Sequence, residues 1–233
     1  MKNKKRIILI TLVCLLTAAL MVGGTMAWLT DTDAKENKIK IADVGTTPEE
    51  PHWPDPDNPV PVYPGVPQAK DPTITVDEGS SPVYVRVLVK IHTKLLNKLV
   101  DTSEALTFTG GEGDDAWEIT GSALPTPNSP WVKNGNGIVD GDYTYLEYRY
   151  NTVVDGFNDA GEAEAFEIET PVFSGFKLKE EAKVEDFTVD GTVDGDPIDM
   201  DIVVVSQCIQ AAGQIDADTA FSNLGSVVDA FIN

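Results

Sequence analysis

Residues that commonly carry catalysis are scarce in this chain. The two histidines, His52 and His92, stand far apart, and neither belongs to a His-Glu-x-x-His motif. A catalytic zinc ion needs three fixed protein ligands and an open position, which closely spaced histidines normally supply. Gly-x-Ser-x-Gly, P-loop and dinucleotide-binding patterns do not occur in the sequence either. We therefore expect no enzymatic activity, and we interpret His92 as a half-exposed sheet residue rather than a metal ligand.

Aspartates in glycine-rich turns offer a second kind of chemistry, because hard Ca²⁺ ions prefer carboxylate oxygens. One such segment runs from Asp190 to Asp201, and another contains Asp140 and Asp142. Neither has the spacing of an EF-hand loop or its closing glutamate, and Asp-Gly is also a frequent hairpin dipeptide. We interpret both as solvated turns and expect no cofactor. The alternative is a calcium site, with candidate ligands Asp190, Asp194, Asp196 and Asp199.

The thiol chemistry of the chain rests on two cysteines, Cys14 and Cys208. Cys14 belongs to an N-terminal segment that we expect to be removed, so the mature protein would keep one thiol and form no internal disulfide. Cys208 stands in an apolar run, which favours a packed small hydrophobic side chain over a nucleophile or an intermolecular bridge.

The N-terminal segment has the order of a secretory signal. Basic residues 2–6 precede an apolar run from Ile7 to Val22, and small residues follow. Thr25 and Ala27 occupy the small positions, so we expect signal peptidase to cut between Ala27 and Trp28. The apolar run is shorter than the roughly 20 residues of a membrane span, which makes an uncleaved anchor the less favoured alternative. We expect a secreted protein that meets the membrane only through residues 1–27, before cleavage.

Two further segments precede the expected domain. Residues 28–45 predict a short alternating strand, with Ile39, Ile41 and Val44 on one side and charged residues on the other. Residues 46–70 contain eight prolines between Thr46 and Pro67, which predicts an extended tether rather than a ligand for an aromatic groove. We expect Trp53 and Tyr63 to anchor this tether against the domain.

Residues 71–233 read as one β-rich domain. Short runs of alternating or β-branched residues are separated by clusters of Gly, Asp and Asn. The predicted strands cover residues 73–76, 83–91, 117–119, 143–150, 165–168, 187–189 and 200–209. This pattern predicts an all-β fold with minor helices, arranged as a jelly-roll-like β-sandwich.

Two segments carry helical periodicity instead. The first is 93–106, with leucines at helical spacing. The second is a C-terminal helix that Asp216 or Asp218 would cap, although Gly225 in its middle weakens the prediction. Its apolar stripe consists of Ala220, Phe221, Leu224, Val227, Val228 and Phe231. We interpret both stripes as faces that dock on the core.

The net charge restricts the partners of the mature protein. Residues 1–27 hold four of the 17 basic residues and none of the 38 acidic ones, so the mature chain is more acidic than the full sequence, whose net charge is −21. A charge of this size keeps chains soluble and repels phosphate polymers. Nucleic acid is therefore excluded as an expected partner.

Three regions carry family patterns in a fixed order. They are Gly23–Asp33 with Asn37–Val44, Lys70–Val76 with Val83–Val87, and Ile202–Ala211. Together they resemble the TasA/camelysin family of Gram-positive bacteria, whose members are exported through the signal peptidase SipW. In that family, small residues before an aromatic-x-(Ser/Thr/Asn)-Asp segment mark the start of the mature chain, which agrees with a cut before Trp28.

The resemblance implies a structural protein of an extracellular biofilm matrix or surface fibre, whose partners are further copies of itself or other matrix proteins. A free N-terminal strand and an exposed sheet edge are the two parts that β-augmentation requires. The expected donor strand is marked by Trp28, Leu29, Ile39, Ile41 and Val44. The alternative is that this strand folds back onto its own domain.

Two other functions compete with the fibre hypothesis. One is a secreted binding module for a glycan or a cell-surface partner, with Trp117, Trp131 and Tyr143 as the expected aromatic platform. The other is a metalloprotease like camelysin, which the missing zinc motif disfavours.

Overall fold

The computed structural model describes residues 51–52, 61–111 and 113–231, all within one of the two compact units of the chain, 41–233. The expected signal cleavage residues Thr25, Ala27 and Trp28 and the expected donor strand lie outside the described residues.

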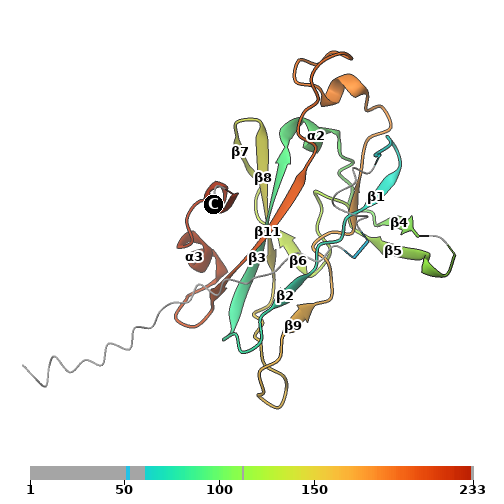
Figure 1. Ribbon diagram of the computed structural model, residues 1–233. Helices are drawn as coiled ribbons and strands as arrows, with labels where there is room; N and C mark the ends of the chain where they lie inside the picture. Colours follow the sequence, from blue (N-terminus) through green and yellow to red (C-terminus); the bar gives the residue numbers. More distant parts are fainter. Residues whose placement is uncertain (1–50, 53–60, 112, 232–233) are drawn as a thin grey trace, which may run out of the picture. The chain divides into compact units, whose positions relative to one another are not determined.

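The largest sheet is antiparallel and is built around β3 (Val83–His92). On one side, β3 pairs with β11 (Ile202–Gln210), and on the other it pairs with β8 (Tyr143–Tyr150). Two short strands, β6 (Trp131–Lys133) and β7 (Ile138–Asp140), then pair with different stretches of β8. The strand order is therefore β11-β3-β8, and β6 and β7 share the position beyond β8 (Figure 1).

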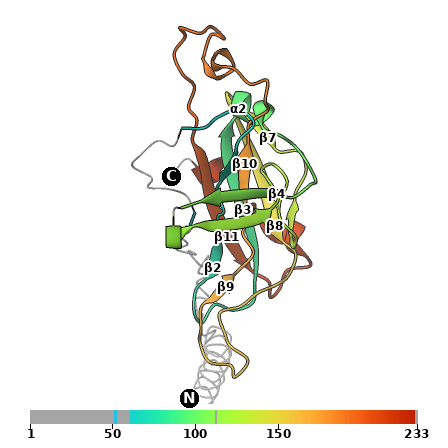
Figure 2. The ribbon, with the colours of Figure 1, turned by 90° about the vertical axis from the view of Figure 1, so that its right-hand side faces the viewer.

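Three two-stranded ribbons complete the described sheet structure. They are β1 (Pro67–Ala69) with β10 (Gly175–Lys177), β2 (Ile74–Val76) with β9 (Phe166–Ile168), and β4 (Leu106–Gly110) with β5 (Trp117–Gly121). The 3₁₀ turn η1 (Gly113–Asp115) lies between β4 and β5. Figure 2 shows that the β4–β5 hairpin runs across the direction of the large sheet.

The main core lies on one face of β3. Side chains of a strand alternate between its two faces, so every second residue from Val83 to Ile91 points to the same side. These residues are at most 3% exposed and pack in one cluster with Ile74 of β2, Ile168 of β9 and Phe176 of β10. Full burial of such aliphatic side chains contributes about 1.5–3 kcal/mol each.

The opposite face of β3 is covered by the C-terminal segment. Leu88 of β3 and Tyr145 of β8 form a second buried cluster with Val227 and with η3 (Val228–Phe231). The short helix α3 (Ala217–Ser222) precedes this segment. The core face of β3 is wholly aliphatic, whereas the face under the C-terminal segment carries Arg86 and Lys90 on either side of Leu88.

The all-β class with minor helices is confirmed. The strands predicted at 73–76, 83–91, 117–119, 143–150, 165–168 and 200–209 correspond to β2, β3, β5, β8, β9 and β11. The strand predicted at 187–189 is wrong. Phe187 ends the 3₁₀ helix η2 (Val184–Phe187), and Thr188 forms only an isolated bridge with Pro197.

Both predicted helices are shorter than expected. Helix α2 covers Thr93–Lys98, because Leu99 turns extended, bridges Leu178 and is 2% exposed. The packing of Leu99 in the core thus outweighs the helical spacing of the leucines. The C-terminal helix is capped by Asp216, which accepts a hydrogen bond from the Thr219 amide. It is divided into α3 and η3, and Gly225 between them has a φ of +88°.

The tether predicted for residues 46–70 ends earlier than Lys70. Strand β1 lies inside this range and pairs with β10, and the Gly65 amide already bonds to the Leu178 carbonyl at 3.0 Å. Val62, not Tyr63, packs against the main core, whereas Tyr63 is 62% exposed. The anchoring role expected for Tyr63 is therefore wrong, and Trp53 lies outside the described residues.

Candidate functional site

Among the strands that the structure describes, the two outermost positions of the large sheet differ in a way that bears on assembly. The edge formed by β6 and β7 consists of two three-residue strands separated by the turn 134–137. The edge formed by β11 is nine residues long and contains no charged residue and no proline. Short, interrupted or charged edges discourage the addition of another strand, whereas a long uncharged edge is a template for one. The β11 edge is therefore the candidate assembly surface.

The side chains of β11 prepare its two faces differently. Val204 and Cys208 are buried in the main core, whereas Val203 on the other face is 40% exposed. Gln207 on that face accepts hydrogen bonds from Arg86 of β3 at 2.9 and 2.7 Å. A strand added beside β11 would extend the main core on one side, and on the other it would lie beside Val203, Val205 and Ile209, with Gln207 as the polar residue among them.

A buried charge network fixes the surface next to β11. Arg86 is 2% exposed and lies 3.6 Å from Glu147, which also binds Arg149 at 2.7 Å. Arg149 in turn forms an ion pair with Asp218 of α3. Both guanidinium groups lie over the ring of Phe221, at 4.9 and 5.1 Å from its centroid. Burial lowers the pKa of Arg86, and the neighbouring Glu147 opposes that effect.

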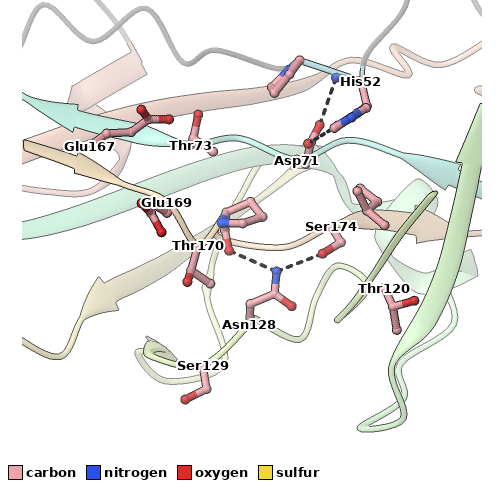
Figure 3. Close-up of a pocket in the computed structure, with 13 residues that line it drawn as sticks. His52, Asp71, Thr73, Thr120, Asn128, Ser129, Glu167, Glu169, Thr170 and Ser174 are labelled. Atoms are coloured by element: carbon pink, nitrogen blue, oxygen red, sulfur yellow. Dashed lines mark hydrogen bonds and ion pairs between the residues drawn. The ribbon is translucent and has the colours of Figure 1, made fainter. Parts of the chain in front are cut away.

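A second candidate site is a polar cavity of about 700 Å³ on another part of the domain (Figure 3). Glu167 lies in β9 and Glu169 directly follows it, on either side of the buried Ile168. Because side chains alternate along a strand, both carboxylates lie on the cavity side. The lining also includes an amide and several hydroxyls. They belong to Thr73, Thr120, Asn128, Ser129, Thr170 and Ser174.

The wall of this cavity holds a histidine–carboxylate pair. Nδ1 of His52 lies 2.6 Å from Oδ2 of Asp71, and the His52 amide donates to Oδ1 at 3.3 Å. Asp71 is 4% exposed, and a carboxylate so deeply buried needs hydrogen-bond donors. The His52 ring also packs 4.4 Å from the ring of Trp117. The pair attaches the Pro51–His52 segment to the domain.

A carboxylate that orients a histidine also occurs in catalytic triads, where the histidine activates a nucleophile. In the described part of the chain, however, no serine or threonine hydroxyl bonds to His52. Asn128, on the cavity floor, accepts from the Ser122 amide and donates to Pro171 and Ser174, at 2.6, 3.0 and 3.0 Å. Its polar atoms therefore join the loops that carry Ser122, Pro171 and Ser174.

The four calcium candidates are not brought together. Asp190 accepts hydrogen bonds from Thr192, which lower its pKa. Asp199 instead accepts from the Tyr143 hydroxyl at 2.9 Å. Among the described residues, no group of three or more Asp, Glu, His or Cys side chains is placed to hold a metal ion. Asp194 and Asp196 belong to the same turn, and the segment is a set of locally bonded turns.

His92 and Cys208, two residues considered in the sequence analysis, are both buried in the fold. His92 is only 8% exposed, so the prediction of a half-exposed residue is wrong. Its Nδ1 accepts from the Lys94 amide at 3.1 Å and caps α2, which accounts for its burial. Cys208 is 1% exposed, as predicted for a packed side chain, and burial raises the pKa of its thiol to about 11.

The aromatic platform expected for a glycan does not form. Trp131 is 3% exposed, and its indole nitrogen donates to the Thr170 carbonyl at 2.9 Å. Trp117 packs on His52, while Tyr143 packs on His92 at 5.6 Å. The three rings therefore serve three separate contacts, because strand pairing places them on different elements.

Sequence reasoning missed the His52–Asp71 pair and the Arg86 network. Asp71 stands in a Lys-Asp-Pro segment before a strand, and Arg86 is the single charge between Val83 and Val89. A charge inside an apolar strand is a signal of a buried ion pair, but only the folded chain supplies the partner.

No helix within the described residues has the length and apolarity needed to cross a membrane. Comparison with family models, with curated proteins and with solved structures finds no match for this chain. Membership of the TasA/camelysin family therefore stays a prediction.

Proposed function

We propose that this protein is an exported structural subunit of an extracellular matrix or surface fibre, joined by strand addition at the β11 edge. The observation that carries the proposal is the contrast between the two edges of the large sheet. The nine-residue β11 edge has no charge and no proline, whereas the β6–β7 edge is short and interrupted. An edge of the first kind invites a partner strand.

The donor in this proposal is segment 28–44 of a neighbouring copy. Its predicted alternation would place Ile39 and Ile41 on the core side of β11, the side to which Val204 and Cys208 point, and Lys38 and Lys40 on the outer side. Pairing of one copy's N-terminal strand with the next copy's edge does not close on itself, so it yields a filament. Removal of residues 1–27 would release the donor only after export.

The family resemblance and the strongly acidic composition support the same proposal. We also propose that the domain is a jelly-roll-like β-sandwich. In that arrangement, the β2–β9 and β1–β10 ribbons form the second layer over the core face of β3. Fold-back of segment 28–44 onto its own β11 is compatible with assembly, because a strand held by its own domain can exchange with a neighbour.

The test compares the mature chain, residues 28–233, with a truncated chain that begins at residue 45. Light scattering and electron microscopy should show filaments for the first and only monomers for the second. Mixing the truncated chain with an excess of a peptide of residues 28–44 should restore its stability without restoring filaments. If the mature chain stays monomeric under all salt and pH conditions, and truncation leaves its unfolding midpoint unchanged, the proposal fails.

A second candidate function is a binding module, which the polar cavity around Glu167 and Glu169 favours. A glycan array probed with the monomer tests it. Any glycan that binds the unmodified monomer should fail to bind the double variant Glu167→Gln/Glu169→Gln. It should still bind Trp131→Phe, because Trp131 is buried and does not line the cavity.

A further inference from the structure

The turn between β6 and β7 contains two consecutive Asn-Gly pairs, Asn134-Gly135 and Asn136-Gly137. We propose that Asn136 is a site of spontaneous deamidation and that Asn134, two residues away, is protected by the fold. The inference is independent of the proposed function. It rests on different hydrogen-bond environments for two chemically alike pairs.

The reaction is an intramolecular acyl transfer followed by hydrolysis. The backbone nitrogen of Gly137 attacks Cγ of Asn136, the side-chain amide leaves as ammonia, and a five-membered succinimide ring forms. Water then opens the ring at either carbonyl and leaves aspartate or isoaspartate. The balance is loss of one ammonia and gain of one water. Glycine favours the attack, because it has no Cβ to crowd the nitrogen and moves easily between backbone conformations.

The structure leaves Asn136 ready for this step. Its side chain is exposed and makes no hydrogen bond with any described residue. The backbone nitrogen of Gly137 makes none to the described backbone either, since the pairing of β7 with β8 starts only at Ile138. The electrophilic carbon and the attacking nitrogen can therefore approach each other without breaking a hydrogen bond between described residues.

Asn134 is held at both of its donors. Its side-chain amide donates to Oε2 of Glu147 at 3.0 Å, and its backbone amide donates to the Glu147 carbonyl at 2.8 Å. Glu147 is itself only 8% exposed and is fixed by Arg86 and Arg149. Rotation of the Asn134 amide toward the next nitrogen would break the first of these bonds, so the fold raises the barrier at this residue alone.

The product would act on the edge of the sheet. Asn136 lines a cavity of about 220 Å³ together with Glu147, Tyr145 and Val227, so a new carboxylate would face an existing one. Isoaspartate would also lengthen the backbone by one carbon between β6 and β7, which both pair with β8. The length of the segment that joins β6 and β7 links the registers in which these two strands pair with β8. Conversion should therefore weaken the β7–β8 pairing.

The test follows both asparagines in one sample. The mature chain is incubated at mildly alkaline pH in water enriched in heavy oxygen, and peptide mapping reads the label at each position. Asn136 should convert about tenfold faster than Asn134, the ratio expected when one hydrogen bond must break. In denaturant, the deamidation rates of Asn134 and Asn136 should become similar. The denatured chain thus serves as the control for the effect of the fold and requires no variant. Equal rates in the folded chain, or faster conversion of Asn134, would overturn the proposal.

Two variants separate the chemistry from its consequence. Asn136→Gln keeps an amide but disfavours the five-membered ring, so label at this position should disappear. Asn136→Asp carries the charge without the longer backbone. Hydrogen exchange at residues 138–140 should accelerate in purified isoaspartate protein and less in Asn136→Asp, with β11 unchanged in both. Unchanged exchange in the isoaspartate form would refute the effect on the edge.

Discussion

Individual residues in this protein act through partners distant in sequence. Asp71 is a buried carboxylate whose donors come from His52, and Arg86 is a buried cation whose partners come from β8 and β11. Each group is costly to bury alone and acceptable when it is paired. Removal of one partner is therefore expected to cost more than removal of the pair.

We expect His52→Ala to destabilise the domain by about 1–3 kcal/mol, because the Asp71 carboxylate keeps its burial and loses the imidazole donor. The measurement is the urea midpoint of the mature chain. The double variant His52→Ala/Asp71→Asn should recover part of the loss, since a neutral amide is cheaper to bury. A double variant at least as unstable as the sum of both single changes would argue against the pair.

The Cys208 thiol should resist alkylation in the folded chain. Burial raises its pKa to about 11, so at pH 8 only about one thiol in a thousand is ionised, and the sulfur is also shielded. Iodoacetamide should label the mature protein only when denaturant is added. Stoichiometric labelling of the folded chain at pH 8 within minutes would show that Cys208 is accessible.

The C-terminal segment is held in place by contacts with side chains on the outer face of the sheet, whereas the strands are held by backbone pairing. Phe221 is 1% exposed and lies under two guanidinium groups, while Asp218 pairs with Arg149. Helix α3 has only six residues, which is too short to be stable on propensity alone. Its docking therefore depends on these contacts.

Phe221→Ala should cost about 3–5 kcal/mol, the usual range for loss of a buried aromatic side chain. Ile215→Ala is the matched control, because Ile215 stands just before α3 and is 87% exposed. Its effect should stay within about 0.5 kcal/mol. Chemical denaturation of both variants checks the prediction, and similar midpoints would contradict the docking described here.

Helix α3 should fray in acid. Hydrogen bonds from Thr219, the backbone amide first, lower the pKa of Asp216 in the folded chain. The stabilisation is therefore complete above the ordinary aspartate pKa of about 3.9 and is lost as pH falls through the lower folded value. Hydrogen exchange at residues 217–222 should accelerate below about pH 4. Asp216→Asn keeps a good cap and should remove this pH dependence.

At the scale of the whole molecule, the described strands of the large sheet end in two unlike ways, and this asymmetry is what a head-to-tail filament needs. The β6–β7 edge is interrupted by a turn, and the opposite edge is the long strand β11. The position of β11 at the end of the strand order supports the proposed polarity of assembly.

Val203→Lys should suppress filament formation by the mature chain, because a lysine on an edge strand disfavours addition of a further strand. Val139→Lys on β7 is the matched control and should leave assembly intact. Both valines are exposed, at 40% and 66%, so neither change should greatly alter monomer stability. Electron microscopy and sedimentation of both variants decide the matter. If Val203→Lys forms filaments and Val139→Lys does not, the acceptor edge is that of β7 rather than that of β11.

Sequence reasoning located the long strands, because alternation over eight to ten residues, as in β3 and β8, is a strong local signal. It missed β1, β6, β7 and β10, whose three residues each carry too little pattern, and also the five-residue strand β4, whose first residue Leu106 it placed in a helix. It also extended α2 through Leu99, because the leucine spacing is helical while the burial site of Leu99 is set by Leu178.

The sequence by itself determined the β-rich class, the acidic character, an aspartate cap at Asp216 or Asp218 and the burial of Cys208, because each depends on composition or on neighbours within a few residues. Only the tertiary structure decided that His52 meets Asp71, that Trp117, Trp131 and Tyr143 lie apart, and that β11 is outermost among the described strands on its side of the sheet. These outcomes depend on strand order and on register. Both are set by the free energy of the assembled core, to which residues far apart in the chain contribute together.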